Sequence, residues 1–140
     1  IQLDWSGRAV LLFNDTYNAN PDSVRAAIDA LTGLPGPRLL VLGDMGEVGE
    51  EGDAFHREVG QYAAQQGIDW VFTLGELSRH TSSEMAQGRH FERMSDLQHA
   101  VTGLLNQLGS LVVKGSRFMK MEQVVSHALT QAGHREASCC

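Results

Sequence analysis

Residues 10–33 read VLLFNDTYNANPDSVRAAIDALTG, and this stretch decides the fold. The apolar run Val10–Phe13 has the length of a buried strand, and the polar segment Asn14–Asn20 follows it as a turn. Pro21 suits the first position of a helix, where its missing N–H costs nothing. Apolar residues then recur three and four positions apart, as on one face of a helix: Val24, Ala27, Ile28 and Leu31. The stretch predicts one strand-turn-helix unit that ends at Gly33.

The same unit recurs along the rest of the chain. Further apolar runs lie at Leu39–Leu42, Trp70–Leu74, His90–Phe91 and Leu111–Val113. Amphipathic stretches alternate with them: one over Phe55–Ala63 that ends at Gly67, a weaker one at about Ser78–Ala86, one capped by Ser95 that ends at Gly109, and one from Met121 that ends at Gly133.

Strands that alternate with helices form parallel sheets that helices cover on both faces. We therefore expect a doubly wound, mostly parallel α/β sheet of the Rossmann-like kind. Ile1–Leu3 is expected to pair back on Val10–Phe13 through a turn at Ser6 and Gly7, which adds an antiparallel edge strand.

Length and composition limit the class of protein. The 140 residues, of which 42% are hydrophobic, predict one domain over residues 1–133 and a tail over 134–140. The net charge of −6 argues against nucleic-acid binding, which needs clustered Lys and Arg. We expect no membrane insertion and no signal peptide, because apolar runs are short. Cys139 and Cys140 form no disulfide framework, which indicates an intracellular protein.

Histidines give no metal signal, because none of the six pair at helical spacing. His56 follows the core-facing Phe55 and is expected to pack half-exposed rather than to act in catalysis. No nucleophile-base motif is present either, so we expect no catalytic residue of that kind.

Three polar turns follow predicted strands, at the carboxyl edge where open α/β sheets bind ligands. In the first, Asp15 offers a carboxylate for vicinal hydroxyls, Tyr17 an aromatic face, and Asn18 and Asn20 amides that donate and accept. An alternative is that Asp15 and Asn20 only form the turn and cap the helix.

The other two turns carry opposite charges. Asp44 and Glu47 lie in the glycine-rich segment Gly43–Gly52, which is suited to an ammonium group or is simply a solvated loop before a helix. Lys114 and Arg117 follow the last strand and suit a carboxylate or phosphate. The alternative for Lys114 is a cationic turn that satisfies Asp15 or Asp44.

Three blocks carry a resemblance to a known family: DTYNANPDS at residues 15–23, VLGDMGEVG at 41–49 and VKGSR at 113–117. In order and spacing they resemble the C-terminal domain of the Mur ligases of bacterial cell-wall synthesis. Within that family, they are most similar to the ligase that joins D-alanyl-D-alanine to UDP-N-acetylmuramoyl-tripeptide. The first block of that ligase usually opens with two acids, and Asn14 replaces the first of them here.

The resemblance implies a three-domain ATP-dependent enzyme whose central domain holds the phosphate loop and the Mg²⁺ ligands. The tripeptide carboxylate becomes an acyl phosphate, and the dipeptide amine then gives UDP-N-acetylmuramoyl-pentapeptide, ADP and phosphate. Asp15 would bind the ribose, and Tyr17, Asn18 and Asn20 would line the adenine. From charge and place, we expect Asp44 and Glu47 at the ammonium end of the dipeptide, and Lys114 and Arg117 at an anionic end.

The resemblance also implies a cytoplasmic bacterial monomer that partners the N-terminal and central domains of the same enzyme, and a C-terminal domain that is inactive alone. Two other hypotheses remain. A phosphoacceptor signalling domain would use Asp15 and Lys114, but the run that ends at Leu74 supplies no aspartate to phosphorylate. A plain nucleotide-binding module would need a glycine-rich first turn, and residues 15–21 contain no glycine.

Overall fold

The computed structural model describes residues 1–46 and 48–138, and side chains of the last helix as far as residue 133. The elements follow in the order β1 (Gln2–Trp5), β2 (Arg8–Asp15), α1 (Pro21–Thr32), β3 (Arg38–Gly43), η1 (Gly49–Glu51), α2 (Gly52–Gln65), β4 (Trp70–Leu74), α3 (Arg79–Ser82), β5 (Gly88–Phe91), α4 (Met94–Leu104), β6 (Ser110–Lys114), η2 (Arg117–Met119) and α5 (Glu122–Ser138).

The strands form one six-stranded sheet in the order β1-β2-β6-β3-β4-β5. All neighbouring strands pair in parallel except β1 and β2, which form an antiparallel hairpin. Ser6 and Gly7 both have positive φ, 54° and 83°, as the tight hairpin turn requires. The prediction of a mostly parallel sheet with an antiparallel N-terminal edge strand is thus confirmed.

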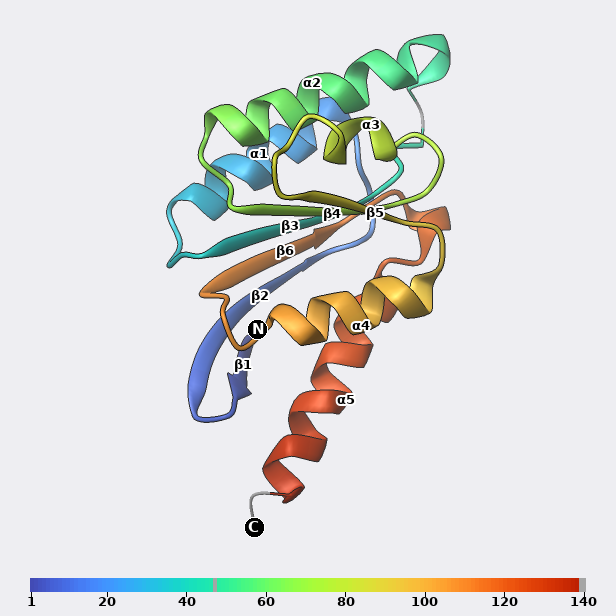
Figure 1. The fold of residues 1–140 in the computed structure, drawn as a ribbon. Coiled ribbons are helices and arrows are strands. Elements are labelled where there is room, and N and C mark those ends of the chain that lie inside the picture. Colours follow the sequence, from blue (N-terminus) through green and yellow to red (C-terminus); the bar gives the residue numbers. More distant parts are fainter. Residues whose placement is uncertain (47, 139–140) are drawn as a thin grey trace.

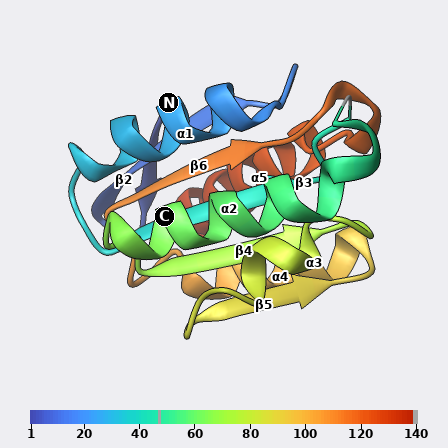
Figure 2. The same ribbon diagram turned by 90° about the horizontal axis from the view of Figure 1, so that it is seen from above.

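Helices cover both faces of the sheet (Figure 1). Helices α1, α2 and α3 lie over one face, and the view from above shows α4 and α5 beyond the other face (Figure 2). The core is correspondingly divided into two clusters, one packed under α1 and α2 and the other under α4 and α5. The buried central strands β3 and β6 contribute apolar side chains to both clusters.

Helix α1 forms as its sequence predicts. Asn20 caps it, because its side chain accepts from the Ser23 N–H while the Ser23 hydroxyl accepts from the Asn20 N–H. Val24, Ile28 and Leu31 are fully buried. This capping and the buried stripe fix where the preceding turn, which carries Asp15 and Tyr17, meets the helix.

Two predicted helix limits are wrong in the middle of the chain. The helix expected over Ser78–Ala86 is only Arg79–Ser82, because the chain turns back so that Gln87 can accept from the Val71 N–H and start β5. The helix expected to start after a Ser95 cap begins at Met94, with Arg93 in the extended capping position and no side-chain cap.

The glycine stops also differ from the prediction. Helix α4 ends at Leu104, and Gly109 serves another purpose: a Cβ there would lie 2.5 Å from the Pro35 carbonyl oxygen. Helix α5 continues through Gly133 to Ser138. A lone glycine costs a helix only about 1 kcal/mol, so it does not by itself end one.

Candidate functional site at the carboxyl edge of the sheet

The first and last predicted turns meet at the carboxyl edge. Asp15 and Lys114 are register partners of the parallel strands β2 and β6. The Lys114 Nζ donates to Asp15 Oδ2 at 2.7 Å and to the Asn18 carbonyl at 3.0 Å. The Lys114 side chain is only 2% exposed, whereas the Asp15 side chain is 50% exposed. Lys114 therefore fixes one oxygen of a carboxylate that stays open to solvent. This agrees with the alternative prediction for Lys114, a cation that pairs with Asp15 within the fold.

A groove of about 540 Å³ lies beside this pair. Its walls include Tyr17, Asn18, Gly46, Ser116, Arg117, Phe118 and Lys120. Tyr17 and Phe118 are large aromatic side chains left 72% and 63% exposed. The Arg117 guanidinium lies over the Tyr17 ring, 5.1 Å from its centroid. The groove thus offers flat aromatic surfaces and cationic groups close to an open carboxylate.

Asn20 uses its side-chain oxygen within the fold. That oxygen caps α1 by accepting from the Ser23 N–H at 2.8 Å. Tyr17 and Asn18, in contrast, line the groove itself. Of the three residues predicted to line an adenine ring, Tyr17 and Asn18 therefore line the groove, whereas the side-chain oxygen of Asn20 is engaged in the helix cap.

Asp44 anchors the turn after β4 instead of facing solvent. Its carboxylate accepts from the Ser78 N–H at 2.8 Å and from the Leu77 N–H at 3.1 Å, and the residue is 8% exposed. Gly75 makes this contact possible, because a Cβ on it would lie 2.4 Å from Asp44 Oδ1. Glu47, the other acid predicted for an ammonium group, lies outside the described residues.

His56 is a residue whose role sequence reasoning missed. The prediction of half-exposed packing is wrong, because the side chain is 0% exposed. Its Nε2 accepts from the Met45 N–H at 3.0 Å, and its Nδ1 lies 2.7 Å from the Gly52 carbonyl oxygen. Burial lowers the pKa of His56 below its ordinary value of 6.5, which keeps the ring neutral near pH 7.

A second pocket, of about 340 Å³, opens at the ends of β4 and β5. It is lined by Gly75, Glu76, Arg79, His90 and Glu92. Among the residues described, neither the Arg79 guanidinium nor the Glu76 carboxylate has an ion-pair partner. The His90 ring is held by the Thr73 hydroxyl at 2.9 Å, and burial lowers its pKa below 6.5.

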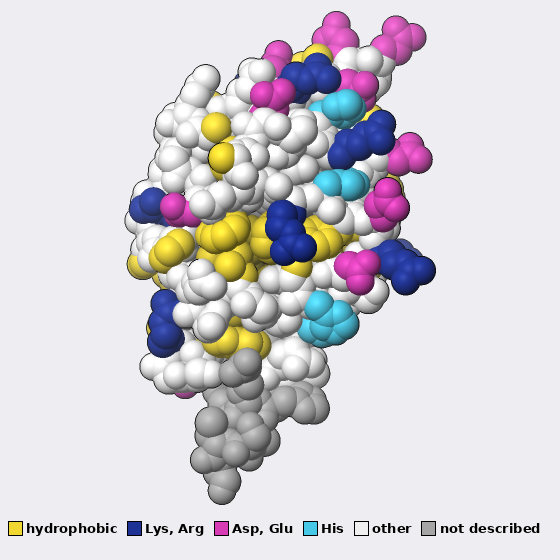
Figure 3. Space-filling model, in the orientation of Figure 1, with side chains coloured by type: hydrophobic (Ala, Val, Ile, Leu, Met, Phe, Trp, Pro, Cys, Tyr) yellow, Lys and Arg dark blue, Asp and Glu magenta, His cyan; other side chains and the backbone are white. Residues whose placement is uncertain are grey.

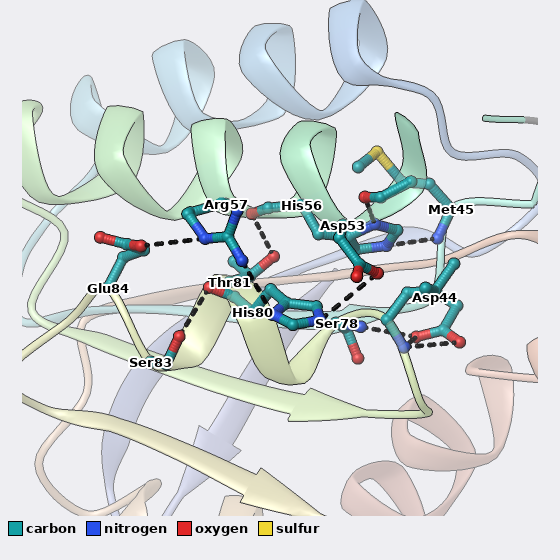
Figure 4. Close-up of polar contacts among 12 residues, drawn as sticks. Asp44, Met45, Asp53, His56, Arg57, Ser78, His80, Thr81, Ser83 and Glu84 are labelled. Atoms are coloured by element: carbon teal, nitrogen blue, oxygen red, sulfur yellow. Dashed lines mark hydrogen bonds and ion pairs between the residues drawn. The ribbon is translucent and has the colours of Figure 1, made fainter. Parts of the chain in front are cut away.

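Glu76 follows directly on the strand that the sequence predicts to end at Leu74. Arg79 and Glu76 carry no motif, so a strand-end position was the one signal that could have found them. Figure 3 shows cationic, acidic and imidazole side chains interspersed along the edge of the molecule where the strands end. The close-up of the α2–α3 region shows the neighbouring polar contacts, including Asp44 and His56 (Figure 4).

Metal and membrane signals are absent from the part of the chain that the structure covers. Among the side chains that the structure describes, in residues 1–46 and 48–133, no group of three or more His, Cys, Asp or Glu is arranged to hold a metal ion. In the same part, no helix has both the length and the apolar character to cross a bilayer.

Comparison with known proteins finds relatives over most of this chain. A ligase named UDP-N-acetylmuramoyl-tripeptide–D-alanyl-D-alanine ligase from Escherichia coli is 42% identical over 125 residues, which is 88% of this chain and 27% of the relative. The ligase of the same name from Haemophilus influenzae is 46% identical over 83% of this chain and 26% of its own length. The chain thus spans about a quarter of these curated relatives.

Solved structures show the same architecture. The MurF ligase of Thermotoga maritima in complex with ADP matches with a TM-score of 0.76 and 25% identity, over 90% of this chain and 29% of its own. A MurF structure from Acinetobacter baumannii matches with a TM-score of 0.81 and 26% identity, over 93% and 29%. The family model described as "Mur ligase, glutamate ligase domain" matches residues 3–117. This chain therefore belongs to the Mur ligase family, in its glutamate ligase domain.

Proposed function

We propose that this chain is the C-terminal domain of an ATP-dependent ligase that joins D-alanyl-D-alanine to UDP-N-acetylmuramoyl-tripeptide. The products would be UDP-N-acetylmuramoyl-pentapeptide, ADP and phosphate. The relatives named UDP-N-acetylmuramoyl-tripeptide–D-alanyl-D-alanine ligase support this proposed reaction. The observation that carries the proposal is the open Asp15 carboxylate, held by the buried Lys114, which also donates to the carbonyl of Asn18 on the wall of the aromatic groove.

The groove is the proposed nucleotide side. An ionised carboxylate accepts hydrogen bonds from vicinal hydroxyls, and Asp15 keeps one oxygen outside its bond to Lys114. Tyr17 presents an exposed ring on which a purine base can stack, and Asn18 lies beside it. Asn20 takes part by holding the start of α1, because its oxygen is engaged in the cap. ATP supplies the activation of the tripeptide carboxylate as an acyl phosphate.

The dipeptide is proposed to lie on the other side of the Asp44 turn. Lys114 and Asp44 act through the turns that they hold, since both side chains are buried and paired. Glu47 stays the proposed contact of the ammonium end of the dipeptide, and Arg117, in the groove, stays the proposed contact of an anionic end. The pocket lined by Glu76, Arg79 and Glu92 adds charges of both signs that suit a zwitterion, with its carboxylate toward Arg79.

The domain is proposed to work only with the N-terminal and central domains of the same enzyme. Those domains would supply the phosphate loop and the Mg²⁺ ligands, and closure of the C-terminal domain would exclude water from the reactants. The enzyme is proposed to be a cytoplasmic monomer. It would need no contact with nucleic acid or insertion into membrane.

The test uses the full-length ligase that carries this chain. D15A should raise the KM for ATP more than the KM for D-alanyl-D-alanine, because the ribose contact is lost. D22A is the matched control, since the Asp22 side chain is 99% exposed. An ATP KM that is unchanged in D15A would remove Asp15 from the nucleotide.

The dipeptide side is tested separately. R79Q and E76Q should each raise the KM for D-alanyl-D-alanine about tenfold, the loss of one charged contact, with little change in the KM for ATP. E50Q, in the exposed first turn before α2, is the control. Equal KM values for the dipeptide in R79Q, E76Q and the wild type would exclude this pocket.

A further inference from the structure

We propose that His56 is a positioning residue that holds the Asp44–Gly46 turn in place for both ligand pockets, and that only its neutral imidazole can do so. The inference rests on the proposed function for its kinetic readout. Its structural basis is the fully buried ring between the turn and the start of α2. Figure 4 shows the ring directed from α2 toward Met45.

The two ring nitrogens have opposite roles. The Met45 N–H can only donate, so Nε2, at 3.0 Å, must be the unprotonated acceptor. The Gly52 carbonyl can only accept, so Nδ1, at 2.7 Å, must carry the proton. One proton therefore satisfies both contacts. A second proton on Nε2 would set two N–H groups against each other in a site that excludes water.

The turn that this bond holds connects the two pockets. On one side, Asp44 accepts from the Leu77 and Ser78 amides next to the Glu76 pocket. On the other side, the Gly46 N–H donates to the Ser116 hydroxyl, and both residues line the aromatic groove.

The Asp44 carbonyl also accepts from the Ser116 N–H at 3.1 Å. Met45 stands between these two attachments. Loss of its bond to His56 would therefore let the turn shift at both pockets together.

The surroundings favour the neutral ring. Burial is the largest influence and lowers the pKa of His56, and the neighbouring His80 lowers it further. The hydrogen bond to the Gly52 carbonyl opposes this, and so do the Asp44 and Asp53 carboxylates from the β3 turn and from α2. The His56 carbonyl accepts from the buried Thr81 hydroxyl at 2.6 Å, so α3 closes the remaining side with an uncharged group.

The role is one of position and not of contact with substrate. The ring is 0% exposed, so it cannot reach a ligand in either pocket. A role in packing alone is the competing explanation. The two are separated by two substitutions of similar size, because a Gln amide oxygen can accept from the Met45 N–H where Nε2 does, whereas the Met thioether is only a weak acceptor.

The experiment compares H56Q and H56M in the full-length ligase. Gln and Met have the same chain length and similar volume, so both variants change packing to a similar degree, and both are checked for folding by circular dichroism. H56Q should keep the KM values for ATP and D-alanyl-D-alanine within about twofold of the wild type. H56M should raise both about tenfold, the loss of one hydrogen bond of about 1.4 kcal/mol. Equal changes in the two variants would overturn the proposal in favour of packing.

The pH profile is the second readout. In the wild type both KM values should rise together as the pH falls well below 6.5, because the pKa of His56 is lowered from that value, and the rise should be absent in H56Q. A rise that persists in H56Q would assign the effect to another group. That outcome, too, would overturn the proposal.

A measurement on the wild type keeps the test decisive if neither variant folds. The imidazole ¹⁵N spectrum of the full-length protein should show Nδ1 protonated and Nε2 bare at about pH 7. A protonated Nε2 would refute the proposal outright. A wild-type protein with this spectrum but without ligase activity would refute the proposed function while leaving the His56 bond intact.

Discussion

Lys114 Nζ lies 2.7 Å from Asp15 Oδ2, and the two residues are register partners at the ends of β6 and β2. One side chain is almost wholly buried and the other half-exposed. A buried ammonium needs its carboxylate more than a half-exposed carboxylate needs its ammonium. The buried Lys114 ammonium therefore holds the Asp15 carboxylate in place while that carboxylate stays open to solvent.

This asymmetry predicts unequal effects on stability. D15A should lower the free energy of unfolding by about 2 kcal/mol, because Lys114 keeps only the Asn18 carbonyl. K114M should cost less, because it removes the buried charge together with its need for a partner. Urea denaturation of the two variants measures the difference. A larger loss in K114M than in D15A would contradict this account of the pair.

Asp44 is expected to be structural in its own right. D44N replaces one accepting oxygen with an NH₂ group that faces the Leu77 and Ser78 amides. The expected loss is about 1–3 kcal/mol of unfolding free energy, the cost of buried groups left unsatisfied. Thermal unfolding followed by circular dichroism checks it, with D53N as the exposed control. Unchanged stability in D44N would mean that the β4 turn does not depend on this carboxylate.

Two glycines predict opposite effects of the same substitution. Gly75 has φ of +115°, and a Cβ there would lie 2.4 Å from Asp44 Oδ1, so G75A should destabilise by more than about 2 kcal/mol. Gly133 lies in α5 with nothing within 4 Å, so G133A should stabilise by about 0.5–1 kcal/mol. Urea midpoints of both variants measure the contrast. Similar midpoints would show that the close approach at Gly75 is relieved at little cost.

Acid should destabilise the fold through three histidines. Burial lowers the folded-state pKa of His56, His90 and His127 below 6.5, and His99 lowers that of His127 further. Below pH 6.5 the unfolded chain therefore binds more protons than the folded chain, and stability falls as the pH falls. The loss should grow until the pH reaches the folded-state values. Urea midpoints between about pH 8 and pH 5 measure it, and H56Q should flatten the curve.

The 140-residue chain alone should bind ATP only very weakly. The contacts proposed for this chain are with the ribose and the base, whereas the phosphate contacts that contribute most of the affinity for a nucleotide are expected in the central domain. Isothermal titration of the isolated chain checks this. Micromolar affinity would mean that the carboxyl edge recognises the phosphates without help.

The sequence by itself determined the layered architecture, because the period of its apolar residues and its turn chemistry are local properties. The run Val10–Phe13 was predicted as a buried strand, and it is a strand in which Val10 and Leu12 are buried while Phe13 is 43% exposed; the stripe from Val24 to Leu31 buries one helical face as predicted. The same logic placed Asp15 and Lys114 at one edge, because parallel strands end together. The short length of α3 was not predicted from the sequence, because the return of the chain to pair with β4 depends on contacts between residues that are distant in the sequence.

Tertiary structure alone decided which polar groups stay open. Asp44 directly follows β3 and Asp15 ends β2. The Asp44 carboxylate accepts from backbone amides and is buried, whereas the Asp15 side chain remains half-exposed. His56 looked ordinary because its partners, Met45 and Gly52, are brought to it by a turn that no periodicity describes. Which polar groups are buried, and therefore need hydrogen-bond partners within the protein, is decided only in the assembled fold. Composition and spacing therefore locate the carboxyl edge of the sheet as the candidate site. Only packing decides which of its polar side chains hold the fold and which stay open to solvent.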